Sequence, residues 1–232
     1  MEDKRNNQAS VASGDLAEHL SDRASIVELP TIILASASPR RAEILRTVGW
    51  PFETLPLNID ETRAAGEDAA THVQRLARAK AAAAALRYPA SMIVAADTVV
   101  LIDEQILGKP QDDEDARGML RQLSGRWHQV LTGVAFIDGA SAEVRVAYEK
   151  TEVKFAVMSQ DEIDWYVASG EPMDKAGAYA IQGLGARFIE GIRGDYFNVV
   201  GLPVRLLYQL FGANCIDGSL NIGFDRRGDE RR

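Results

Sequence analysis

The sequence TIILASASPRR, from Thr31 to Arg41, passes from an apolar run into small residues and then into a Ser-Pro pair. This order predicts a short strand, a tight turn and a helix that has Ser38 as its N-cap and Pro39 at its first position. Apolar residues continue at helical spacing, and Gly49 stands where a glycine commonly ends a helix. A strand that leads directly into a helix favours an α/β fold.

Two adjacent arginines, Arg40 and Arg41, fall in the first turn of this predicted helix. Cations at that place oppose the helix dipole, and a carboxylate would be preferred there by about 0.3–1 kcal/mol. A phosphate ligand reverses the preference, because helix-start amides and guanidinium groups can then bind one anion together. The alternative is an exposed pair on a solvated face. The position after a strand and a serine-rich turn favours the anion site.

Another polar residue, Asp97, interrupts the apolar run SMIVAADTVVLI between Ser91 and Ile102. Such a run predicts a strand that is buried on both faces. A carboxylate in this strand needs a proton, a cation or a metal, since an unpaired buried charge is very costly. The alternative is an aspartate at the end of the strand that caps a neighbouring element.

Two lysines and one irregular segment supply further polar groups. Lys80 lies in a predicted helix over Glu67–Leu86, where spacing alone favours a solvated side chain. Lys109 follows a glycine in the sequence LGKP, which predicts a loop. The segment EPMDKAGAYAIQGLG, residues 171–185, has no regular period and is rich in glycine. It therefore predicts a loop that brings backbone close to a ligand.

The charge and the cysteine content exclude several classes of protein. The chain has 232 residues and a formal net charge of −8, which argues against a general binder of nucleic acid or of membrane surfaces. An anion site must therefore be a local basic pocket in an acidic protein. Cys215 is the only cysteine, which leaves no internal disulfide or cysteine-rich metal site and predicts a cytoplasmic location. No apolar run approaches the length of a membrane-spanning helix.

The motif LASASPRR, with Asp60-Glu61 downstream, resembles the opening motif of the Maf-like nucleoside triphosphate pyrophosphatases, also described as septum-formation inhibitors. Further blocks of this chain are similar to those of the family and follow in the same order: LARAKA, ADTVV, LGKP, LSGRWHQVLTGV, DKAGAYAIQG and DYFNVVGLP. The resemblance covers about Ile32 to Phe211. The one departure within these blocks is Ala180, where the family usually has glycine.

The resemblance implies an α/β fold of the Maf and ITPase-like type. It implies a long, curved mixed β-sheet flanked by helices, in two lobes with the active-site cleft between them. We expect one pyrophosphatase domain over residues 26–212. Composition predicts a disordered N-terminal extension over residues 1–25 and a flexible C-terminal tail over residues 213–232. A homodimer is left open.

The activity implied is hydrolysis between the α- and β-phosphates of a nucleoside triphosphate with Mg²⁺ or Mn²⁺. The resemblance implies that Asp97 is the base for the attacking water, that Glu61 and Asp97 bind the metal, and that Lys80 and Lys109 stabilise phosphate charge. The residues implied in substrate binding and specificity are Ser36, Arg40, Arg41, Thr98, Lys175 and Gln182. Asp60 and Asp174 complete the charged set.

Within the family, this chain resembles the branch that acts on dTTP and UTP, a nucleotide-pool house-cleaning activity with a link to division arrest. The amide of Gln182 offers a donor and an acceptor, which match the N3–H and carbonyl oxygens of uracil or thymine. The alternative for Gln182 is a bond to its own backbone. Other functions left open are a pyrophosphatase for 7-methyl-GTP or purines, and a non-enzymatic septation regulator that senses a nucleotide.

Overall fold

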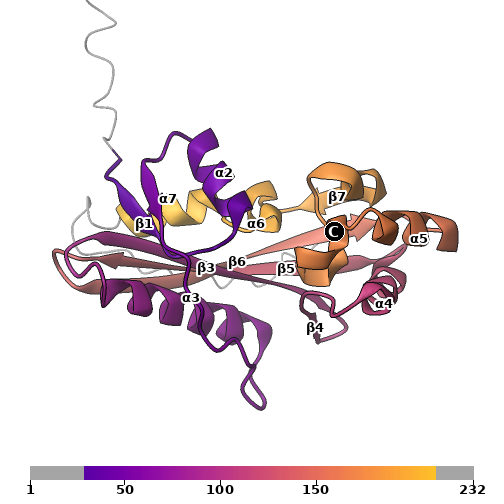
Figure 1. Cartoon of the computed structure of the whole chain (residues 1–232), viewed down its shortest axis with the longest axis horizontal. Helices are drawn as coiled ribbons and strands as arrows, with labels where there is room; N and C mark the ends of the chain where they lie inside the picture. Colours follow the sequence, from indigo (N-terminus) through magenta and orange to yellow (C-terminus); the bar gives the residue numbers. More distant parts are fainter. Residues whose placement is uncertain (1–28, 213–232) are drawn as a thin grey trace, which may run out of the picture.

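The computed structural model describes residues 29–212, so both predicted tails lie outside the described residues. A seven-stranded sheet forms the centre of this region, in the order β2-β1-β3-β5-β6-β7, with β4 beside β3 (Figure 1). The strands are β1 (Ile32–Leu34), β2 (Phe52–Thr54), β3 (Met92–Ile102), β4 (Gln105–Leu107), β5 (Trp127–Asp138), β6 (Glu143–Phe155) and β7 (Ile189–Arg193). Strand β1 runs parallel to β2 and β3, and the other pairs are antiparallel. The mixed sheet flanked by helices is confirmed.

Helices cover both faces of the sheet. They are α2 (Pro39–Thr47), α3 (Ala69–Ala85), α4 (Asp113–Leu123), α5 (Gln160–Ala168), α6 (Tyr196–Val200) and α7 (Val204–Gly212). Short 3-10 turns form η1 (Glu171–Asp174), η2 (Ala176–Ala178) and η3 (Gly183–Phe188). Helices α2 and α7 lie towards one end of the long sheet, and α4 and α5 lie towards the other (Figure 1). Among the described helices, none is long and apolar enough to cross a membrane.

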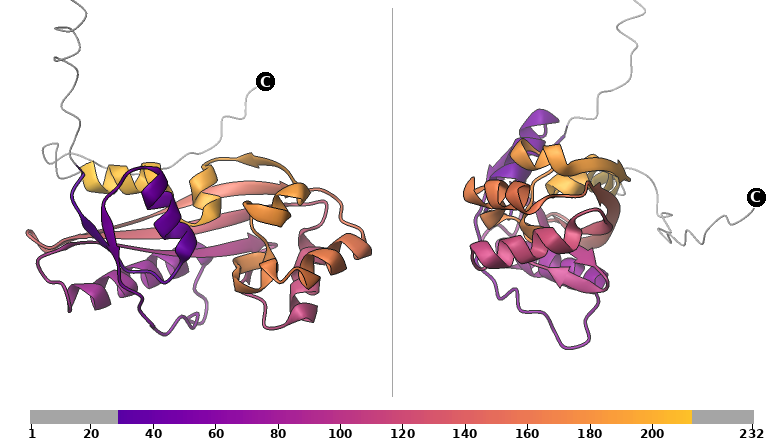
Figure 2. Two further views of the ribbon diagram at one scale, coloured as in Figure 1. Left: turned by 45° about the horizontal axis from the view of Figure 1, so that its top comes forward. Right: turned by 90° about the vertical axis from the view of Figure 1, so that its right-hand side faces the viewer.

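The alternation of side chains along β3 explains these layers. Ile93 and Ala95 point to one face, where they pack with buried alanines of α3. Val94 and Ala96 point to the other face, where they join a core that includes α2 and α7. Farther along, Val100 belongs to a third core with α4 and α5. The prediction of a strand buried on both faces is confirmed, and each end of the sheet has its own core. Figure 2 shows the helices that lie near each end.

Local signals in the sequence predicted both ends of α2 correctly. Ser38 is the N-cap of α2 and Pro39 follows it, while Gly49 has a φ of 68° just after the helix. Strand β4 was missed: the sequence from Leu107 predicted only a loop, but Leu107 pairs with Val100. A hairpin turn with positive φ angles at Asp103 and Glu104 causes this pairing. Helix α6 was also missed, because five residues are too few to show a period.

Candidate active site

A gap in the sheet forms the centre of the candidate site. On one edge of β3, β1 pairs with residues 92–94 and β4 pairs with residues 100–102. Residues 95–99 of that edge have no strand partner among the described residues, although β5 pairs along their other edge. A cavity of about 520 Å³ opens there, and residues from both ends of the sheet line it. The break in pairing therefore places Asp97 and Thr98 beside the cavity, in the middle of the sheet.

On the α3 side of this gap, Lys80 contacts two carboxylates. Its Nζ lies 2.7 Å from Asp97 Oδ1 and 2.7 Å from Glu61 Oε1. Lys80 and Asp97 are both buried, with 8% exposure each. The sequence alternatives of a solvated lysine and a capping aspartate are therefore wrong. Partial burial raises the pKa of Glu61, but its hydrogen bond to Lys80 and the nearby positive charge outweigh this and hold the pKa below its ordinary value.

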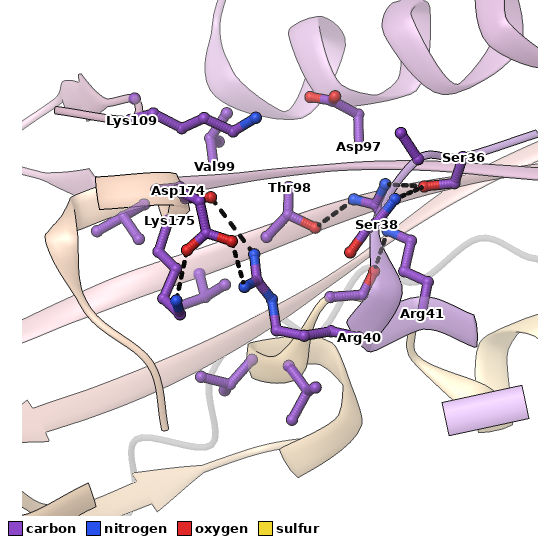
Figure 3. Close-up of a pocket in the computed structure, with 18 of the residues that line it drawn as sticks. Ser36, Ser38, Arg40, Arg41, Asp97, Thr98, Val99, Lys109, Asp174 and Lys175 are labelled. Carbon is purple, nitrogen blue, oxygen red and sulfur yellow. Dashed lines mark hydrogen bonds and ion pairs between the residues drawn. The ribbon is translucent and has the colours of Figure 1, made fainter. Parts of the chain in front are cut away.

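On the opposite side of β3, Arg41 is buried in a network of protein hydrogen bonds (Figure 3). Its guanidinium donates to the Gly201 carbonyl at 2.8 Å, to Ser36 Oγ at 3.0 Å and to Thr98 Oγ1 at 3.1 Å. Burial lowers the pKa of Arg41, and the charge of Asp97 opposes that shift. The guanidinium thus ties the helix start to β3 and to the chain after α6, and it forms a fixed wall of the cavity.

Arg40, although adjacent in sequence, points to the other end of the cavity. Its Nη1 lies 3.1 Å from Asp174 Oδ2 in η1. Lys175 also bonds to the carboxylate of Asp174, and it donates to the Glu171 carbonyl at 2.6 Å. Figure 3 shows Arg40 and Lys175 on either side of Asp174. These contacts link the two ends of the molecule across the cavity, with the Asp174 carboxylate between the two cations.

The remaining predicted residues, Lys109, Gln182 and Asp60, differ in their position relative to the cavity. Lys109 lines the cavity and extends in the direction of Asp97 (Figure 3). Gln182 is an exposed lining residue whose side chain makes no capping bond to the start of η3. Asp60 does not line the cavity; its Oδ1 accepts from the Thr62 amide at 2.9 Å.

One cavity residue was missed from the sequence, and Glu171 of the glycine-rich loop has a supporting position. His72 lines the cavity together with Leu76 and Lys80, and this i, i+4, i+8 spacing on α3 was a signal that could have revealed it. Glu171 arranges the glycine-rich loop, since its carboxylate accepts from the amides of Leu184 at 2.9 Å and Gly185 at 3.0 Å. Glu171 is therefore a loop support and not a ligand of the cavity.

The fold and the site define a class: an α/β protein whose nucleotide-sized cavity combines several cations with two carboxylates on one lysine. The chain belongs to the family of Maf-like proteins, whose model matches residues 31–214.

Curated relatives share much of this sequence. A dTTP/UTP pyrophosphatase of Symbiobacterium thermophilum is 52% identical over 179 residues, which are 77% of this chain and 91% of the relative. Proteins of the same name from Koribacter versatilis and Clostridioides difficile are 50% and 46% identical, over 77% and 81% of this chain and 92% and 98% of theirs. The solved structure of the Staphylococcus aureus Ham1 protein aligns with 80% of this chain and all of its own, at 14% identity and a TM-score of 0.46. A likeness that distant adds nothing to the assignment.

Proposed function

We propose that this protein is a pyrophosphatase that hydrolyses dTTP and UTP to the nucleoside monophosphate and pyrophosphate. The observation that carries the proposal is the bridging of Asp97 and Glu61 by Lys80 inside a cavity lined by further cations. Such a set can hold a polyphosphate and still offer a carboxylate to a water molecule. The names of relatives about half identical to this chain support the same substrates. The single cysteine favours a cytoplasmic location.

In this proposal, Asp97 and the lysines have different roles in the reaction. Asp97 Oδ1 accepts from Lys80, which leaves Oδ2 to accept a proton from the attacking water. The buried ammonium of Lys80 orients that carboxylate. Lys109, which extends towards Asp97, stabilises charge that develops on the phosphates. Arg40 and Lys175 exchange part of their contact with Asp174 for phosphate oxygens when the substrate binds.

The carboxylates of this cavity fit a divalent metal. Asp97 and Glu61 each place one oxygen 2.7 Å from the Lys80 ammonium, so the two carboxylates are close neighbours at the cavity. Among residues 29–212, no group of three acidic, histidine or cysteine side chains could hold a metal. Mg²⁺ commonly binds through one or two carboxylates, with the other positions given to phosphate and water. When bound, it would neutralise charge on the phosphates. We propose Asp97 and Glu61 as its protein ligands.

Removal of divalent metal should stop turnover without unfolding the protein. We expect EDTA to lower the rate of pyrophosphate release from UTP at least tenfold, and excess Mg²⁺ or Mn²⁺ to restore it, because carboxylate oxygens suit these ions better than they suit structural zinc. The thermal unfolding midpoint should stay within a few degrees, since the proposed ligands line the cavity and do not belong to the hydrophobic cores. A protein that EDTA unfolds would show instead that the metal is structural.

Base selectivity tests the choice of substrate. Against a panel with Mg²⁺, we expect dTTP and UTP to give kcat/KM at least tenfold above 7-methyl-GTP and dITP. Gln182→Ala should change the ratio between bases more than Thr98→Ala does. Gln182 is exposed at the cavity, whereas the Thr98 hydroxyl is engaged by Arg41 and by Thr132 at 2.9 Å. Best turnover with 7-methyl-GTP, or a base ratio that ignores Gln182, would contradict this substrate choice and leave the pyrophosphatase reaction in place.

A further inference from the structure

The segment that carries Glu61 has no regular secondary structure of its own. Residues 55–68, here called the Glu61 loop, join β2 to α3 without a helix or strand. The Glu61 side chain is 56% exposed, and Lys80 Nζ is its ion-pair partner at 2.7 Å. Ion pairs with that much solvent access typically stabilise a structure by about 0–1 kcal/mol. The contact with Lys80 is therefore too weak to keep Glu61 in one position by itself.

A buried carboxylate, that of Glu67, lies at the far end of the Glu61 loop. Its oxygens accept from Arg75 Nε at 2.6 Å and Nη2 at 2.9 Å, and from the Ala64 amide at 3.1 Å. His72 Nδ1 lies 3.0 Å from Oε2. The hydrogen bonds from Arg75 hold the pKa of Glu67 well below its ordinary value, so this carboxylate is ionised at neutral pH. A two-pronged arginine–carboxylate pair fixes the orientation of the guanidinium group.

The oriented guanidinium also reaches the backbone beside Glu61. Arg75 Nη2 donates to the Thr62 carbonyl at 3.1 Å, and Thr62 directly follows Glu61. Arg75 and Lys80 lie on the same rigid helix, α3. Helix α3 therefore holds the loop at two consecutive residues: Arg75 holds the backbone, and Lys80 holds the Glu61 side chain.

We propose that Arg75 is a positioning residue, which sets the backbone next to Glu61 and so aims the Glu61 carboxylate at Lys80 and the cavity. Glu67 orients Arg75 for this task. A lysine at position 75 would keep the charge, but it lacks the planar guanidinium group that donates to Glu67 and Thr62 at the same time. The effect on turnover rests on the proposed function, in which Glu61 is a ligand of the metal. The effect on the loop does not.

Two measurements on Arg75→Met test the proposal, with Arg78→Met as the matched control. Arg78 lies on the exposed side of the same helix and does not line the cavity. We expect amide hydrogen exchange over residues 60–64 to quicken at least tenfold in Arg75→Met. We also expect kcat for UTP to fall about tenfold and the Mg²⁺ concentration for half-maximal rate to rise, with KM for UTP within about threefold. Arg78→Met should match the unchanged protein in amide exchange, kcat, Mg²⁺ requirement and KM.

A double-mutant cycle separates positioning from a general effect on the fold. In a Glu61→Gln background, Arg75→Met should lower kcat by less than about twofold, because the carboxylate that Arg75 positions is already gone. Independent, multiplicative effects would overturn the proposal, and so would unchanged exchange over residues 60–64. If Arg75→Met does not fold, Arg75→Lys takes its place with the same expectations. If the protein without any substitution fails to hydrolyse UTP, the proposed function is overturned. Hydrogen exchange would then still decide whether Arg75 holds the loop.

Discussion

Asp97→Asn should lower kcat for UTP by about 10²–10⁴, the range expected for the loss of a general base. Asparagine keeps the shape of the side chain, but it cannot take a proton from water at neutral pH. The fold should survive the change, because Lys80 keeps Glu61 as an ion-pair partner at 2.7 Å. Steady-state turnover and thermal unfolding of the same preparation check both expectations.

The matched control is Asp103→Asn. Asp103 lies just beyond the end of the same strand and pairs with Arg126 at 2.6 Å, away from the cavity. Its loss should leave kcat within about twofold. If a folded Asp97→Asn protein retains turnover within about threefold of the unchanged protein, Asp97 is not the base.

Gly133→Ala should lower the free energy of unfolding by about 3 kcal/mol. Gly133 is paired with Asp97 in the sheet, and α3 crosses it closely. An added Cβ would lie 2.3 Å from the Val73 carbonyl oxygen and 2.8 Å from the Gln74 nitrogen. Both are backbone atoms and cannot rotate away, so the helix would have to move off the sheet.

Urea unfolding measures this effect, and Gly118→Ala in α4 is the control. A Cβ at Gly118 meets no atom within 4 Å, and alanine in a helix should be neutral or stabilising by up to about 1 kcal/mol. Because α3 carries Lys80, we also expect Gly133→Ala to lower turnover. A loss of stability below about 1 kcal/mol would show that helix and sheet can separate at little cost.

Sequence patterns predicted β3 and α3 because these elements show an apolar run or a helical period over many residues. Strand β3 falls within the predicted run Ser91–Ile102, and α3 falls within the predicted helix Glu67–Leu86. Strand β4 and helix α6 have three and five residues, too few to show a period. The open edge of β3 could not be predicted either, since it depends on where two other strands stop.

The sequence predicted which residues belong to the candidate site better than it predicted which residues they contact. The doubled arginine marked the site, but the sequence gives both arginines the same surroundings. Arg41 is buried, and one of its hydrogen-bond acceptors, the Gly201 carbonyl, lies 160 residues later in the sequence. Arg40 instead meets Asp174. Spacing alone favoured a solvated Lys80, whose partner Asp97 lies in another element. Such long-range contacts have no local period.

The products formed from UTP test the central claim most directly. The purified protein is incubated with UTP and Mg²⁺, and the nucleotides, pyrophosphate and phosphate are separated and counted. Cleavage between the α- and β-phosphates predicts UMP and pyrophosphate in equal amounts, with no UDP. UDP and phosphate would contradict this account, and so would tight binding of UTP without any turnover, the behaviour of a nucleotide sensor.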